Sequence, residues 1–232
     1  MNYKIINDEA MFRDFISWLP VLKKDECFYM VLMARKKYCK GLPEGVPGIS
    51  RDKAQLRRFT VADISMMYDK VKQLECELGS YVSERIAIPN EALALYITPN
   101  PRNLQKAAKE SLIRLANLVT EPYNGYNPHQ EVMSITQKSC SRKWVVDFDF
   151  DDMDFSKEFS DVLVNCVDTS VVSVVKTRGG FHLLVHTDRL EGHSVKNWYK
   201  CISGMGCDVK GDSLLPVVGC CQGGHTPYFL IR

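Results

Sequence analysis

The nine residues 144–152, with the sequence WVVDFDFDD, constrain the fold of this chain more than any other segment. Their apolar start predicts a β-strand, in which side chains two positions apart point to the same face of a sheet. Asp147 and Asp149 would then lie side by side on one face. Phe148 and Phe150 would point into a core on the opposite face. Because neighbouring carboxylates repel one another unless a cation neutralises them, the pattern predicts a site for a hard divalent cation, Mg²⁺ or Mn²⁺.

A strand end that runs into a solvated acidic loop is the competing interpretation of the same segment. The three acids that follow the pair, Asp151, Asp152 and Asp154, are expected to be solvated. Two further segments decide between the interpretations, because each would bring more polar groups to the pair.

The first of these segments, 176–182, has the sequence KTRGGFH and predicts a tight turn between two strands. A glycine pair at such a turn lets backbone N–H groups approach an anion. Lys176 and Arg178 bracket the turn with positive charge suited to phosphate oxygens, and His182 could donate a hydrogen bond to a polyphosphate. An ordinary hairpin with a surface histidine would look the same, and His186 is expected to be such a surface residue.

The second segment, 207–212, has the sequence CDVKGD. Asp208 lies between small apolar neighbours, as a ligand on a strand would, whereas Asp212 has the surroundings of a turn. Either aspartate could complete a metal site of three carboxylates.

Composition excludes few functions. Of the 232 residues 45% are hydrophobic and 25% charged, which is ordinary for a soluble globular protein, and a net charge of +2 excludes no class of partner. No stretch has the apolar length of a membrane span, so no membrane association is expected. Because the N-terminal segment lacks the apolar core of a signal peptide, the nine cysteines are expected to be reduced thiols in an intracellular, cytoplasmic protein.

Apolar spacing predicts an α+β fold in two parts, a helical or mixed part over 1–125 and an antiparallel-sheet part over 126–232. A connector with two prolines and two tyrosines lies between them at 121–128, and a loop with Pro43, Gly45, Pro47 and Gly48 lies earlier. Helices are predicted over 9–19, 61–78, 102–118, 156–163 and about 192–203. Strands are predicted over 27–33, 92–98, 143–150, 170–176 and 181–186, with short strands within 207–218 and 226–231.

Together the three polar segments resemble the motifs of the archaeo-eukaryotic primase superfamily, which includes primase-polymerases and is common in phages and plasmids. Asp147-x-Asp149 is similar to the first motif, Thr177 with Gly180-Phe181-His182 to the second, and Asp208 to the third. The resemblance covers residues 90–232 and includes Asn100-Pro101-Arg102 after a predicted strand. The second motif often has a serine where this chain has Gly180, which leaves the role of Thr177 open.

The resemblance implies an RRM-like antiparallel-sheet catalytic module packed with the N-terminal helical or mixed α/β module. It implies a DNA primase or primase-polymerase that joins NTPs or dNTPs on a single-stranded DNA template with two divalent ions, Mg²⁺ or Mn²⁺, for DNA replication. The implied catalytic residues are Asp147, Asp149, Asp208 and His182, and the implied metal ligands are Asp147, Asp149, Asp208 and Asp212. The residues expected to bind the nucleotide are Lys176, Thr177, Arg178, Gly179, Gly180 and His182. No helicase motif occurs, so a separate helicase or a second primase subunit is an expected partner, in the host cytoplasm if a phage encodes the chain.

Two weaker patterns remain. Basic residues that could contact template phosphates, although such clusters usually form solvated faces, are Arg35, Lys36, Lys37, Arg57, Arg58 and Arg102. A zinc site could use His193, Cys201, Cys207 and Cys220 or Cys221, but these spacings are not those of a zinc ribbon or finger.

Two other functions stay open at this point. A metal-dependent nuclease could use the same acids and histidine, but it has no triphosphate for the basic hairpin to hold. A catalytically inactive, nucleic-acid-binding subunit of a replication complex could keep the fold without the reaction. The sequence does not decide between ribonucleotides and deoxyribonucleotides, or between starting chains and extending them.

Overall fold

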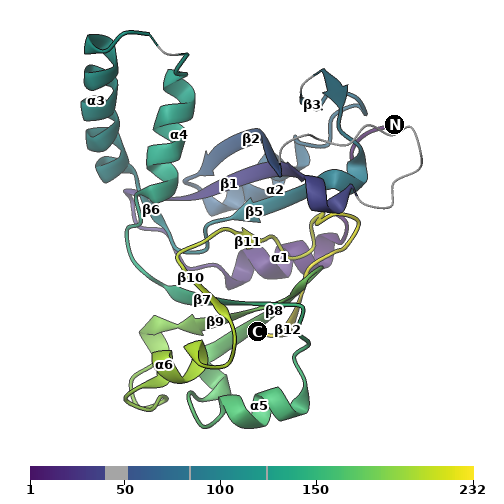
Figure 1. Ribbon diagram of the computed structural model, residues 1–232, viewed down its shortest axis with the longest axis vertical. Helices are drawn as coiled ribbons and strands as arrows, with labels where there is room; N and C mark the ends of the chain where they lie inside the picture. Colours follow the sequence, from purple (N-terminus) through teal and green to yellow (C-terminus); the bar gives the residue numbers. More distant parts are fainter. Residues whose placement is uncertain (40–51, 84, 124) are drawn as a thin grey trace.

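Two five-stranded antiparallel sheets form the framework of the protein, and each is built around strands that are apolar and buried along most of their length (Figure 1). The computed structural model describes residues 1–39, 52–83, 85–123 and 125–232. Within them the chain is a mixed α+β protein with these two sheets, a two-stranded ladder and six α-helices. The predicted α+β class is therefore confirmed, whereas the predicted proline and glycine loop at 43–48 lies outside the described residues.

The N-terminal sheet has the strand order β11–β5–β1–β2, and β6 also pairs with β1. Its central strand, β1 (Glu26–Arg35), is buried along nearly its whole length. The other strands are β2 (Lys53–Val61), β5 (Leu93–Ile97), β6 (Arg102–Asn103) and β11 (Leu215–Pro216). Because β11 comes from the last fifth of the chain, the C-terminal segment crosses back to complete the N-terminal sheet. The division of the chain at 125/126 stays a prediction.

The C-terminal sheet has the strand order β10–β7–β9–β8–β12. Its strands are β7 (Val145–Asp151), β8 (Val172–Thr177), β9 (Gly180–His186), β10 (Asp208–Gly211) and β12 (Tyr228–Ile231). Two helices, α5 (Lys157–Leu163) and α6 (Trp198–Ser203), pack on one face through Phe159, Leu163 and Ile202. Phe148 and Phe150 belong to this core, as the strand period predicts.

Helix α1 (Glu9–Trp18) lies between the two sheets (Figure 1). Asp8 caps it by accepting a hydrogen bond from the N–H of Met11, and Phe12, Phe15 and Trp18 are buried. The apolar core around α1 includes residues of both sheets, and the indole of Trp18 donates to the Ser173 hydroxyl on β8 at 3.0 Å. This helix is therefore the main packing element that joins the sheets.

A pair of antiparallel helices, α3 (Leu104–Thr120) and α4 (Pro128–Lys138), projects from the end of the N-terminal sheet (Figure 1). The predicted helix at 102–118 is confirmed, but α4 was not predicted. Its signal was present, because Asn127 accepts hydrogen bonds from two N–H groups of the first turn and Pro128 occupies the first helical position. The predicted connector ends in this cap.

Two predicted helices are shorter than expected. The segment 61–78 contains a 3-10 turn (Ile64–Met66) and helix α2 (Met67–Lys72) only. Beyond α2 the chain folds back, and the Glu75 carboxylate accepts hydrogen bonds from the N–H groups of Ile5 and Ile6. In the segment 192–203 only α6 is helical, because Ser194 forms a β-bridge with Val167 instead. The ladder of β3 (Val82–Ser83) and β4 (Ile86–Ala87) was also not predicted.

One disulfide, between Cys166 and Cys201, ties the chain after α5 to α6. The expectation that all nine cysteines are reduced thiols is therefore wrong for this pair, which is adjacent in space although distant in sequence; the other seven are free. The bond also removes Cys201 from the suggested zinc set. No helix in the described part of the chain is both long and apolar enough to cross a membrane.

Candidate functional site

The acid pair of β7 lies on the face of the C-terminal sheet that α5 and α6 leave uncovered. Asp149 lies directly opposite Asp208 on β10 and directly opposite His182 on β9. Residues at opposed positions of neighbouring strands point to the same face. Three adjacent strands therefore bring Asp147, Asp149, Asp208 and His182 to one face.

Asp147 is the buried member of this group, with a side chain only 1% exposed. Its Oδ1 lies 2.8 Å from Nδ1 of His182, and its Oδ2 accepts a hydrogen bond from the Ser213 hydroxyl at 2.6 Å. The other ring nitrogen of His182, Nε2, lies 3.5 Å from Oδ1 of Asp149. The imidazole therefore lies between the two carboxylates of the pair.

Burial disfavours the charged form of His182, but the neighbouring carboxylates of Asp147, Asp149 and Asp151 outweigh burial and raise the pKa of the imidazole. The two carboxylates of the pair therefore favour the protonated form of the His182 imidazole.

Asp208 and Asp212, the two candidates for a third carboxylate, have different surroundings. Asp208 is exposed on the edge strand β10, opposite Asp149. Asp212 accepts hydrogen bonds from the guanidinium of Arg102 through both its oxygens and from the Asn100 amide at 3.1 Å. Burial opposes ionisation of Asp212, but Arg102 and Asn100 hold the pKa of its carboxyl below the usual range. Asp212 is thus committed to a structural ion pair, and Asp208 is the better candidate for a metal ligand.

Arg102 is 1% exposed, so the expectation that it contacts template phosphates is wrong. Besides Asp212, its guanidinium donates to the carbonyl oxygens of Asn100 and Gln137. These bonds hold Arg102 in the interior, where no nucleic acid reaches it.

The β8–β9 hairpin differs from the expected anion cradle. Lys176 points to the helix-covered face of the sheet and pairs with Asp154 at 2.5 Å. Arg178 donates to the Gly223 carbonyl and lies over the Tyr38 ring, 4.8 Å from its centroid. Neither basic side chain of the hairpin therefore lies beside the acid pair. The alternation of side chains along β8 directs Lys176 to the opposite face of the sheet, and Arg178 extends toward Gly223 in the C-terminal segment.

Close packing between β7 and β9 explains why residue 180 is a glycine. A Cβ at this position would lie 1.9 Å from the Phe150 carbonyl oxygen, so only glycine lets β9 approach β7 this closely. Thr177, Gly179 and His182 are the hairpin residues that line the pocket beside the acid pair.

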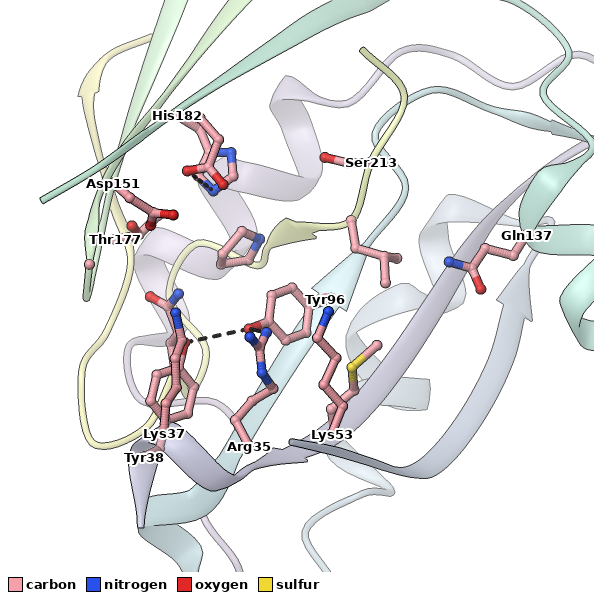
Figure 2. Close-up of a pocket in the computed structure, with 16 residues that line it drawn as sticks. Arg35, Lys37, Tyr38, Lys53, Tyr96, Gln137, Asp151, Thr177, His182 and Ser213 are labelled. Atoms are coloured by element: carbon pink, nitrogen blue, oxygen red, sulfur yellow. Dashed lines mark hydrogen bonds and ion pairs between the residues drawn. The ribbon is translucent and has the colours of Figure 1, made fainter. Parts of the chain in front are cut away.

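This pocket, about 430 Å³ in volume, is lined by side chains of both sheets (Figure 2). Asp151, Thr177 and His182 lie on one side, and Arg35, Lys37 and Lys53 lie on the other. Asp149 also lines the acidic side. The pocket can therefore hold a ligand that carries both a metal ion and negative charge.

Two tyrosines, Tyr38 and Tyr96, form part of the basic side (Figure 2). The Tyr96 hydroxyl accepts a hydrogen bond from Arg35 at 3.0 Å and lies 3.5 Å from the Tyr38 hydroxyl. These contacts fix the direction of the Arg35 guanidinium. Arg35 and Lys37, which were expected to contact a template, line the pocket across from the acid pair.

The other expected nucleic-acid contacts do not line this pocket. Arg57 lies over the Tyr81 ring, and Arg58 donates to the Ser134 hydroxyl of α4 at 3.0 Å. Lys36 is exposed next to the pocket residue Lys37. Sequence reasoning missed the pocket residues Tyr38, Lys53, Tyr96, Gln137, Ser213 and Gln222. Ser213 had a signal in the sequence, because it follows a candidate ligand.

His186, expected at the surface, is 1% exposed. Its Nε2 lies 2.9 Å from the Ser173 hydroxyl, and its ring contacts Trp18 and Trp144 edge to face. Burial lowers the pKa of this imidazole to about 4. His186 is therefore a neutral residue of the core between the sheets.

The donor atoms suit hard cations, since Asp147, Asp149 and Asp208 offer carboxylate oxygens on one face. Among the residues that the structure describes, however, no three metal-ligating side chains converge on one point. Comparison with protein-family models, with curated proteins and with solved structures found no match to this chain. Any functional assignment therefore depends on the site alone.

Proposed function

We propose that the protein is a template-dependent nucleotidyltransferase of the primase or primase-polymerase type, which joins NTPs or dNTPs for DNA replication. The observation that carries the proposal is the pocket with carboxylates and His182 on one side and Arg35, Lys37 and Lys53 on the other. A nucleoside triphosphate bound to a divalent ion needs both kinds of wall, because the cation binds carboxylates and the phosphate oxygens bind basic side chains.

The reaction requires little covalent chemistry from the protein. A 3′-hydroxyl oxygen forms a bond to the α-phosphorus of the nucleotide, the bond from that phosphorus to pyrophosphate breaks, and the hydroxyl proton passes to solvent. Catalysis then consists of positioning and of stabilising negative charge. Arg35, Lys37 and Lys53 would bind the phosphates. They take the role that the sequence suggested for Lys176 and Arg178.

Asp147, Asp149 and Asp208 are the residues that would hold Mg²⁺ or Mn²⁺. When bound, the ions would activate the attacking hydroxyl and neutralise charge on the departing pyrophosphate. Binding requires Asp149 and Asp208 to turn toward Asp147, because the described side chains do not yet converge. Asp149 is half-buried and Asp208 is exposed.

We also propose an RRM-like arrangement for the catalytic module. The order along the chain is β7, α5, β8, β9, α6 and β10, and the order in the sheet is β10–β7–β9–β8. This is the split β-α-β pattern in which two helices cover one face of a four-stranded antiparallel sheet. The proposed site occupies the face opposite α5 and α6, which α1 and the N-terminal sheet cover in part.

A metal-dependent nuclease explains the acidic side of the pocket, but it leaves the basic side without a polyphosphate to bind. A catalytically inactive binding subunit gives no reason for a buried Asp147 held next to His182, since burying a carboxylate is costly. One assay distinguishes the three functions, because the polymerase extends or starts chains, the nuclease degrades the template, and the binding subunit does neither.

The test is to incubate the purified protein with single-stranded DNA, primed and unprimed, labelled NTPs or dNTPs, and Mn²⁺ or Mg²⁺. We expect short products with the wild type and none with Asp149→Asn. Asp161→Asn is the matched control, because this exposed carboxylate lies on α5, on the opposite face of the sheet. Degradation of the template that depends on Asp149 would favour the nuclease. Template binding without either reaction would overturn the proposal in favour of the binding subunit.

A further inference from the structure

The short connection at residues 212–214 joins the two sheets next to the acid pair. Strand β10 ends at Gly211, which lies opposite Asp147 in the register and has a φ of 66° that lets the chain turn there. Strand β11 then begins at Leu215, in the other sheet. The connection therefore leaves one sheet at Asp147 and enters the other.

The first residue of the connection, Asp212, is anchored in the N-terminal part of the chain by Arg102 and Asn100. The same Asn100 side chain accepts hydrogen bonds from the N–H groups of Trp144 and Val145 at 2.7 and 2.8 Å and donates to the Val145 carbonyl at 3.0 Å. Asn100 thus holds both the start of β7 and the connection, so both lie at fixed positions relative to Asp147.

The second residue, Ser213, lines the pocket and directs its hydroxyl toward the side on which His182 lies (Figure 2). Its hydroxyl donates to Oδ2 of Asp147 at 2.6 Å, while His182 contacts Oδ1. A carboxylate with one partner on each oxygen cannot rotate about its last bond without losing a hydrogen bond. Ser213 and His182 together therefore set the orientation of the Asp147 carboxylate.

We propose that Ser213 is a positioning residue for the divalent ion, because its hydroxyl holds Asp147 in the orientation from which it can bind the ion together with Asp149. This inference rests on the proposed function and adds to it a residue outside the three motifs. Each Asp147 oxygen keeps a second lone pair for the cation when the hydroxyl and the imidazole occupy the first.

A merely structural role of Ser213 would lower stability without changing metal affinity. Removing the hydroxyl leaves Oδ2 of a buried carboxylate without this donor, so the metal-free protein should lose stability in either case. The readout must therefore be the affinity for Mn²⁺ itself. Outer partners of metal ligands typically change metal affinity by roughly 10-fold to 100-fold when they are removed.

The experiment is a titration of the full chain with Mn²⁺, followed by electron paramagnetic resonance of the free ion, without nucleotide or template. We expect Ser213→Ala to raise the Kd for Mn²⁺ roughly 10-fold and Ser213→Thr, which keeps the hydroxyl, to retain the wild-type Kd. Ser213→Val is matched in shape to the threonine variant and lacks its hydroxyl, so it tests the same point if the alanine variant does not fold. Ser203→Ala is the control, because the Ser203 hydroxyl donates to the Tyr199 carbonyl on α6.

Equal Mn²⁺ affinities of the wild type and the folded variants that lack the hydroxyl would overturn the inference. Equal weakening by threonine and valine would also overturn it, because the hydroxyl would then not be the cause. If the wild type binds no Mn²⁺, both the inference and the metal part of the proposed function fail. If binding depends on the hydroxyl but no nucleotide is joined, the inference stands and the proposed function fails.

Discussion

Asp149 on β7 and Asp208 on β10 occupy directly opposed positions of neighbouring antiparallel strands. Carboxylates at such positions can share a divalent cation, which offsets the repulsion between their charges. Asp212, four residues after Asp208, forms an ion pair with Arg102.

The two candidates for the third carboxylate should therefore respond differently to substitution. We expect Asp208→Asn to weaken Mn²⁺ binding and nucleotide joining strongly, and to change the midpoint of metal-free urea unfolding less than Asp212→Asn does, because Asp208 is exposed. Asp212→Asn should lower that midpoint and affect metal binding less. Mn²⁺ titration and urea unfolding of the two variants measure both effects, and a reversed pattern would make Asp212 the ligand.

The basic side of the pocket should determine nucleotide affinity. Lys53→Ala should raise the KM for the nucleotide roughly 10-fold, as expected for a lost hydrogen bond to a charged phosphate, with a smaller effect on kcat. Lys176→Ala should leave KM unchanged, because Lys176 points to the opposite face of the sheet and pairs with Asp154. Steady-state kinetics compare the two lysines directly. If only Lys176→Ala raises KM, the polyphosphate lies at the hairpin.

The ion pair between Arg102 and Asp212 should be important for stability. Arg102 is buried and Asp212 is 24% exposed, so Arg102→Ala leaves a partly solvated carboxylate uncompensated and should lower the free energy of unfolding by about 3 kcal/mol, the lower end for a buried pair. Urea unfolding measures this value, with Arg57→Ala, at an exposed position, as the control. Replacing both partners by apolar residues, Arg102→Met with Asp212→Leu, should restore part of the loss. No recovery in the double variant would mean that the hydrogen bonds of Arg102 to carbonyl oxygens dominate.

The burial of His186 should make the fold sensitive to acid. Its pKa is about 4 in the folded protein and near 6.5 when unfolded, so the unfolded chain binds the extra proton between these values. The contribution of neutral His186 is complete above pH 6.5 and is lost as the pH falls toward 4, by roughly 3 kcal/mol in total. Trp18, Trp144 and Ser173 contact the ring, and the nearby charges are those of Asp188 and Arg189.

Urea unfolding of the wild type and of His186→Gln at pH 7.5, 5.5 and 4.5 isolates this effect. His182 has the opposite sign, because its raised pKa adds stability below its unfolded value that is lost as the pH rises, but it is common to both proteins. The difference between the two curves should therefore shrink toward low pH. Parallel curves would show that His186 does not titrate with folding.

Local pattern predicted the parts of the fold that depend on few neighbours. The alternation of β7 placed Asp147 and Phe148 on opposite faces, because the side-chain period of a strand is two. Helix α1 and the β8–β9 hairpin followed from apolar spacing and from a glycine pair. Strand β2 and helix α4 were missed, although the helix had a cap and a proline at its start.

The amino-acid sequence by itself determined the α+β class and the presence of an acid pair backed by a core, because strand period and apolar spacing are local properties. Only the tertiary structure decided which distant side chains meet that pair. The alternation of β8 sends Lys176 to the other face, and the crossing of residues 212–214 brings Ser213 to Asp147. Strand pairing also brings Lys53 to the pocket. The buried Arg102 forms an ion pair with Asp212. The sequence alone does not predict these contacts, because packing between sheets joins residues that are far apart in the chain.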